Sequence, residues 1–268
     1  MRLKKITTLL AGTVVFILLT VLTQIGGLIF VIGLIVNEKL NVKRAFYKFG
    51  VMLGLYFLGT YLMVPVLAGL FGRERIVTTQ NISPTNYMTV FLNRNYVRPE
   101  LNHILLNAEK SLKGTGIEIG YLDASFPFVD GFPLLPHLSH KDGKKLDISL
   151  MYENELGELT NDKVSVSGYG VFEEANDMEI QQTSLCKAKG YFQYDYPKYL
   201  TLGRINENLK YSNKGTRQLV QALLSDADLG KMFIEPHLKQ RLKINDSRIA
   251  FHGCRAVRHD DHIHIQLR

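Results

Sequence analysis

The chain has 268 residues and a formal net charge of +7, long enough for a membrane segment and one domain of ordinary size. Residues 1–75 hold nine basic and two acidic residues, whereas the remaining residues hold 23 of each. The positive excess therefore flanks apolar segments, where lipid headgroups attract it, and no basic stripe remains to follow a phosphate backbone. This pattern excludes nucleic acid as the expected partner and favours a lipid bilayer.

Two runs without charge, residues 6–37 and 49–72, each exceed the about 20 apolar residues that cross a bilayer. The first run is long for one span and short for two. Gln24 and the glycines after it mark a break, a tight hairpin or a helix-packing face. The sequence thus predicts a membrane region over 1–72 with two, or at most three, transmembrane helices and spans at about 6–36 and 49–72. A cleaved signal peptide is not expected, because its apolar core would be about 7–15 residues long.

The polar part begins with turn-forming residues, which predict a linker over 73–96 and a folded domain over 97–268. Hydrophobic periodicity in this domain alternates between helix and strand patterns without a regular βαβ order, which indicates an α+β fold with a small antiparallel sheet and flanking helices. The expected helices cover residues 99–112, 216–224 and 236–242. The expected strands cover residues 117–121, 145–152, 163–172, 231–234 and 262–267.

The chain contains two cysteines, Cys186 and Cys254, without the spacing of a zinc knuckle. Outside the cytoplasm such a pair could form one disulfide. Two separate buried thiols are the alternative, because sequence does not show whether their Cα atoms come close enough.

The last ten residues hold three histidines, His259, His262 and His264. From His262 onward polar and apolar residues alternate, which is the pattern of a strand with one buried face. Such a strand presents His262 and His264 side by side, as a platform for metal ligation. An exposed polar face that happens to carry histidines is the alternative interpretation.

A second histidine stretch lies about 120 residues upstream and contains His137, His140 and Asp147. Gly143 separates His140 from Asp147, so a loop and the start of a strand, not one helix face, would present them. Together His140, Asp147 and His264 have the composition of a catalytic zinc site, which uses three histidine or carboxylate ligands and leaves a fourth position open.

These two stretches, HLSHKDGKKLDI at 137–148 and HDDHIHIQLR at 259–268, resemble the motifs of the penicillin-insensitive murein endopeptidases. That family belongs to the wider lysostaphin, D-Ala-D-Ala peptidase and hedgehog zinc fold. Residues 231–242 (KMFIEPHLKQRL) are similar to the segment before the final motif. The resemblance covers roughly residues 90–268 and is weak over 153–215.

The resemblance implies Zn²⁺ as cofactor, with His140, Asp147 and His264 as its ligands. It places His262 and His259 in the site as the catalytic histidines, and His137 beside a ligand as a supporting residue. Asp260 and Asp261 are expected to be solvated or turn residues, although one of them could orient a site histidine through its other ring nitrogen.

The activity implied by the resemblance is that of a membrane-anchored endopeptidase cutting D-alanyl–diaminopimelyl cross-links of peptidoglycan with a water molecule that the metal activates. Peptidoglycan peptide and the lipid bilayer are then the partners. The domain would stand on the bacterial inner membrane and face the periplasm or the cell exterior. The alternative is a non-catalytic module on the same fold that binds wall peptide or regulates another protein.

Overall fold

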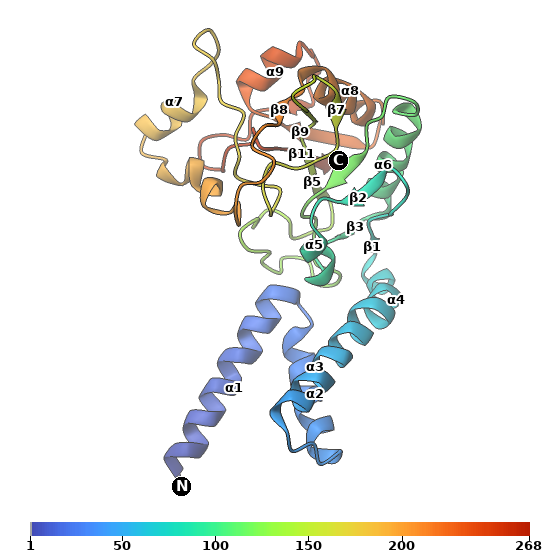
Figure 1. Ribbon diagram of the computed structural model, residues 1–268, viewed down its shortest axis with the longest axis vertical. Helices are drawn as coiled ribbons and strands as arrows, with labels where there is room; N and C mark the ends of the chain where they lie inside the picture. The colour runs from blue at the N-terminus through green and yellow to red at the C-terminus, as the bar shows by residue number, and fades with distance from the viewer. Residues whose placement is uncertain (1) are drawn as a thin grey trace. The chain divides into compact units, whose positions relative to one another are not determined.

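The computed structural model describes residues 2–268, which form an α+β protein of two compact units (Figure 1). The first, here called the helical unit, contains Met1–Arg75, Met88–Arg98 and Ala124–Gly143. The second, here called the sheet unit, contains Ile76–Tyr87, Pro99–Asp123 and Lys144–Arg268. The boundary at residues 143 and 144 falls between the two parts of the upstream histidine motif.

The first apolar run forms two helices rather than one. Helix α1 (Arg2–Thr23) ends before Gln24, whose φ of 66° lies in the left-handed region, and α2 (Gly26–Lys39) follows. A Cβ placed on Gly27 would lie 2.0 Å from Thr20 Oγ1, so α2 packs closely back on α1. Gln24 therefore forms the break and Gly27 lies on the packing face, so two of the alternatives that the sequence left open occur together.

Two helices, Lys5–Thr23 and Ala45–Phe71, are long and apolar enough to cross a membrane by length and composition. The second consists of α3 (Ala45–Leu58), η1 (Gly59–Met63), α4 (Val64–Ala68) and η2 (Gly69–Phe71). Helix α2 has 14 residues and, at about 1.5 Å per residue, is shorter than the about 30 Å hydrocarbon core of a bilayer. The run predicted as one span over 6–36 thus contains one helix of spanning length and one short helix.

The segment predicted as a linker over 73–96 carries regular structure. Strand β1 (Glu74–Arg75) pairs antiparallel with β3 (Tyr96–Val97) in the helical unit. Helix α5 (Tyr87–Phe91) precedes β3, and β2 (Ile82–Pro84) belongs to the sheet unit.

The sheet unit is built on six strands in the order β10–β9–β11–β5–β4–β2. The sheet is mixed, and the prediction of an antiparallel sheet is wrong, because β10 runs parallel to β9 and β2 parallel to β4. Parallel neighbours need a crossover connection, which helices supply at both edges. The remaining bounds are β4 (Ile119–Tyr121), β5 (Lys145–Ser149), β9 (Leu229–Phe233), β10 (Ile249–Ala250) and β11 (His262–Leu267).

Helices α6 (Pro99–Ser111) and α9 (Pro236–Leu242) lie in these crossovers, and α8 (Asn213–Leu224) packs against both. Ser212 caps α8 by accepting a hydrogen bond from Gly215 N–H, which lets the helix begin three residues earlier than predicted. The other elements are a three-stranded sheet of β7 (Leu159–Thr160), β6 (Tyr152–Glu153) and β8 (Lys210–Tyr211), with α7 (Gln182–Ala188) and η3 (Phe192–Tyr199).

Residues 163–172, predicted as a strand, form an irregular loop with one isolated bridge between Ser165 and Arg204. Gly168 and Gly170 have φ of 88° and 80°, a conformation that interrupts an extended chain. This loop brings Tyr169 and Gly170 to the final strand, as described below.

Cys186 of α7 and Cys254, in the loop after β10, form a disulfide, so the alternative of two separate thiols is wrong. The bond closes a loop of 68 residues, and chain-entropy arguments give such a loop a stabilisation of about 4 kcal/mol at most.

We expect Cys254→Ser to lower the free energy of unfolding by about 2–4 kcal/mol, because the unfolded chain regains that freedom. Thermal melting of the oxidised full chain, followed by circular dichroism, measures the change. The wild type melted under reducing conditions should match the variant. An unchanged melting temperature in both would contradict a stabilising bridge.

Candidate metal centre

Strand β11 carries the final histidine motif through the middle of the sheet. It pairs with β5 on one side and β9 on the other, so both of its hydrogen-bonding edges are paired. His262 and His264 are only 3% and 2% exposed, and the alternating Ile263 and Ile265 are fully buried. The interpretation of an exposed polar face is therefore wrong. A buried polar pair needs partners, because desolvation without them is unfavourable.

Asp147 of β5 lies opposite His264 of β11 in the strand register. His264 Nδ1 lies 2.8 Å from Asp147 Oδ1, and His262 Nε2 lies 3.6 Å from the same oxygen. Two ligand atoms on one tetrahedral zinc ion at about 2.0–2.1 Å stand roughly 3.4 Å apart. The His264–Asp147 pair fits such an ion after widening by roughly half an ångström.

Three buried histidines gather at this place. His259, His262 and His264 each offer a ring nitrogen, and these three atoms lie within 4.8 Å of one another. The ring of His252 lies 5.1 Å from that of His259 and 6.0 Å from that of His264. The structure therefore contains a buried histidine and aspartate group that could hold a metal ion. His252, exposed in the loop of the disulfide, was not singled out from the sequence.

His259 has the environment of a neutral imidazole. Burial, and then the neighbouring His262 and His264, hold the pKa of His259 well below its usual value. Its Nδ1 is buried and has no hydrogen-bond partner among the residues the structure describes. A neutral ring nitrogen is what metal ligation or proton acceptance requires.

Asp261 orients His262. Its Oδ1 lies 2.5 Å from His262 Nδ1, and its Oδ2 accepts a hydrogen bond from Gly170 N–H at 2.6 Å. A proton held on Nδ1 by this carboxylate leaves Nε2 with its lone pair on the side of Asp147. Asp261 lies in the bend before β11 but is buried, so it is not solvated, and it takes the orienting position that the sequence offered as the other interpretation.

Tyr169 supports the carboxylate from the other side. Its hydroxyl donates a hydrogen bond to Asp147 Oδ2 at 2.9 Å and accepts one from Asp123 N–H at 3.0 Å. Burial, and then the charge of Asp147, raise the pKa of Tyr169 well above its usual value, so the hydroxyl stays protonated and remains a donor. No local motif marks this tyrosine, because its loop reaches the site only through the fold.

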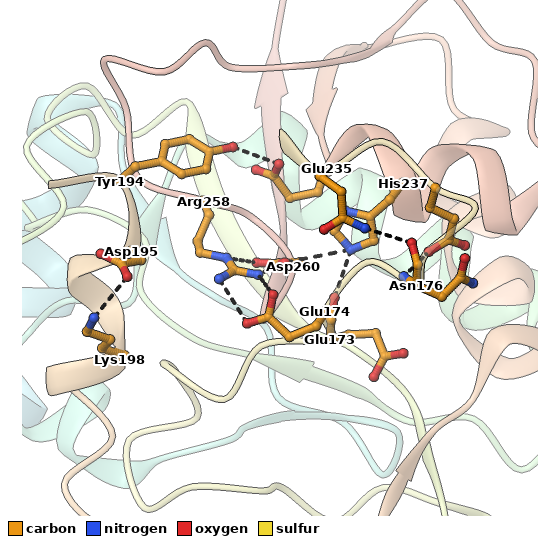
Figure 2. Close-up of polar contacts among 12 residues, drawn as sticks. Glu173, Glu174, Asn176, Tyr194, Asp195, Lys198, Glu235, His237, Arg258 and Asp260 are labelled. Carbon is orange, nitrogen blue, oxygen red and sulfur yellow. Dashed lines mark hydrogen bonds and ion pairs between the residues drawn. The ribbon is translucent and has the colours of Figure 1, made fainter. Parts of the chain in front are cut away.

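Glu235 holds the backbone of His259. One carboxylate oxygen accepts a hydrogen bond from His259 N–H at 2.9 Å. The other accepts one from the Tyr194 hydroxyl at 2.7 Å (Figure 2). The N–H of Glu235 in turn donates to His259 O at 3.2 Å. His259 is therefore fixed through its main chain.

Arg258 and Asp260 form a buried ion pair beside this clamp (Figure 2). Arg258 Nε donates to Asp260 Oδ1 at 2.7 Å, and the guanidinium also donates to Glu174 at 2.8 and 3.0 Å. Asp260 is fully buried, so it is not the solvated residue expected from the sequence. His237 Nε2 lies 3.7 Å from Asp260 and 2.7 Å from Glu173 O.

The upstream histidines belong to the helical unit. His140 is buried, its Nδ1 lies 2.9 Å from Ala124 O, and its N–H donates to His137 O at 2.9 Å. The rings of His137 and His140 are 5.5 Å apart. Asp147, by contrast, belongs to the sheet unit with the C-terminal histidines. If His140 Nδ1 carries a proton and donates it to the carbonyl of Ala124, Nε2 is left as the ligand atom of His140.

No protein-family model matches the chain, and a search of curated proteins finds no match.

Proposed function

We propose that the chain is a membrane-anchored zinc metallopeptidase that hydrolyses peptide cross-links of peptidoglycan, of the D-alanyl–diaminopimelyl type. The buried His264–Asp147 pair beside two further histidines is the observation that carries the proposal. Catalytic zinc sites use histidine and carboxylate ligands and keep one position open, whereas structural sites more often include cysteine. Both cysteines here are joined to each other, which favours the catalytic type.

The ligands we assign are His140, Asp147 and His264, the set that the resemblance of the two sequence motifs implies. His137, hydrogen-bonded through its carbonyl to His140, supports that ligand. When bound, zinc polarises the scissile carbonyl and lowers the pKa of a water molecule. Tyr169 holds the second oxygen of Asp147, which keeps the carboxylate oriented.

Proton transfer falls to His262. Its Nδ1 is engaged by Asp261, so Nε2 can take a proton from the attacking water and return it to the leaving amine. His259 lines the site as a neutral imidazole, because its low pKa keeps the ring from taking up a proton and becoming a cation. No side-chain nucleophile is needed in this scheme.

The cellular setting is proposed from three features. A disulfide is typical of an oxidising compartment. Two helices have the length and composition of membrane spans, and the basic excess of the chain lies around them. These features support a protein of the bacterial inner membrane whose sheet unit meets peptidoglycan in the periplasm or at the cell exterior.

The test is digestion of purified cross-linked muropeptides by the full chain in detergent, with one equivalent of zinc, followed by mass analysis. We expect each cross-linked dimer to give two monomers whose summed mass exceeds that of the dimer by one water. A chelator should abolish this activity, and added zinc should restore it. Zinc binding and muropeptide binding without products would instead favour the non-catalytic module. A chain that binds no zinc would overturn the proposal.

A further inference from the structure

We infer that Arg73 is a positioning residue for His140: it fixes the segment that carries this histidine to the end of the second apolar helix, so that metal affinity depends on that contact. The inference rests on the proposed function, which makes His140 a ligand. It goes beyond the proposed function because it gives the second apolar helix, Ala45–Phe71, a part in holding the metal. All contacts that carry it lie within the helical unit.

Arg73 is placed by the end of the helix. Gly72, with φ of 65°, ends η2 in the left-handed conformation, and Arg73 N–H donates to Ala68 O at 3.1 Å. This pattern closes a helix and sets the direction of the next residue. The side chain of Arg73 is only 1% exposed, although it follows an apolar helix of spanning length.

The guanidinium of Arg73 binds the segment Ala124–Gly143 at three places. It donates to Phe126 O and to the Asp130 carboxylate, and Nη2 lies 3.4 Å from Lys141 O. Phe126 is two residues from Ala124, whose carbonyl holds His140, and Lys141 directly follows that histidine. One guanidinium therefore binds both the segment next to Ala124, which contacts the His140 ring, and the residue that follows His140.

These hydrogen bonds to Phe126 O and the Asp130 carboxylate require arginine at position 73. A planar fork can serve a carbonyl and a carboxylate at once, whereas a lysine ammonium is a single point charge. A Cβ on Gly143 would lie 3.1 Å from Arg73 Nε, so the chain also passes closely over the guanidinium.

Two further contacts hold the same segment. Arg98 N–H donates to Gly143 O at 2.8 Å, and its guanidinium reaches Asp142 O and Asp130, both at 3.2 Å. Phe128 N–H donates to Gln24 Oε1 at 3.0 Å, at the break between α1 and α2. The His140 segment is therefore built onto the helices of this unit, and Arg73 is its buried centre.

The experiment measures zinc affinity of the full chain in detergent by competition with a chromophoric chelator, together with the visible spectrum of the cobalt(II)-substituted protein. Loss of residues that orient metal ligands lowers affinity by about 10–100-fold, and we expect that range for Arg73→Gln. Arg73→Lys should recover part of the loss, and Asp130→Asn should show a smaller loss. The matched control is Arg75→Gln, since Arg75 donates to Thr60 O and the Tyr96 hydroxyl in the same unit.

A double-mutant cycle separates positioning from general destabilisation. We expect the losses of Arg73→Gln and His140→Ala to be non-additive, because both act on one ligand, with the cobalt spectrum altered in the same way. Additive losses, or unchanged affinity in all Arg73 and Asp130 variants while the wild type binds zinc, overturn the inference and leave the proposed function standing. A wild type that binds no zinc overturns both.

Discussion

His264→Ala is expected to abolish zinc binding and muropeptide hydrolysis together. The histidine lies opposite Asp147 in the sheet, and its Nδ1 is 2.8 Å from that carboxylate, so alanine removes one of the proposed ligands. Changing a residue that only orients a ligand costs about 10–100-fold in metal affinity, and losing the ligand itself should exceed about 100-fold. Metal content after dialysis and the product yield from cross-linked muropeptides give the two measurements.

The matched control is Gln266→Ala, two residues further along the same face of β11 and only half-buried. It changes the same strand without touching the proposed ligand set, so zinc content and activity should stay near those of the wild type. Wild-type zinc affinity in His264→Ala would remove His264 from the ligand set, whereas equal losses in both variants would point to damage to the strand.

At a pH high enough to ionise Asp260, Arg258→Met should destabilise the protein by about 3–5 kcal/mol, because it leaves this carboxylate buried without its ion-pair partner. For a chain of this size each kcal/mol lowers the melting temperature by about 2–4 °C, so the expected fall is on the order of 10 °C. Melting of the full chain followed by circular dichroism measures it. Arg255→Met, at an exposed position of the same loop, is the control and should melt like the wild type.

The destabilisation should depend on pH. Burial raises the pKa of Asp260 to about 8, and hydrogen bonds from Arg258 oppose that rise. A carboxyl with a raised pKa in the folded state binds a proton more readily there than in the unfolded chain, where its pKa is about 3.9. Without Arg258 this pKa rises further, so the cost of Arg258→Met is small below about pH 8, where the carboxyl is protonated in both proteins, and grows as the pH rises above about 8.

The double variant Arg258→Met with Asp260→Asn tests the assignment of this titration. Since asparagine does not ionise, the growth of the cost as the pH rises above about 8 should disappear. If the pH dependence persists in the double variant, another carboxyl is responsible, and the buried Glu235, whose pKa burial also raises, is the next one to replace.

The local features of this protein could be predicted from its sequence. Charge-free runs indicated apolar helices, and the alternation from His262 to Leu267 indicated a strand that the structure contains as β11. The α+β class also followed from local periodicity. These predictions succeed because helix and strand periods, and the distribution of charge, depend on residues that are near in sequence.

The surroundings of the site required the tertiary structure. The sequence suggested that Asp147 and His264 act together, but only strand pairing over 117 residues of separation places them opposite each other. Tyr169 and His252 have no local signal at all. The mixed sheet and the disulfide likewise depend on crossover connections and on loops that close over long separations.

The sequence by itself therefore determined which residues have metal-binding chemistry and which helices are apolar. Only the tertiary structure decided that β11 is buried on both faces, that Asp261 and Tyr169 orient the site, and that the His140 segment is built onto the helical unit. The physical reason is that chemistry and periodicity belong to individual residues and short segments, whereas burial and hydrogen-bond partners arise when distant segments pack together.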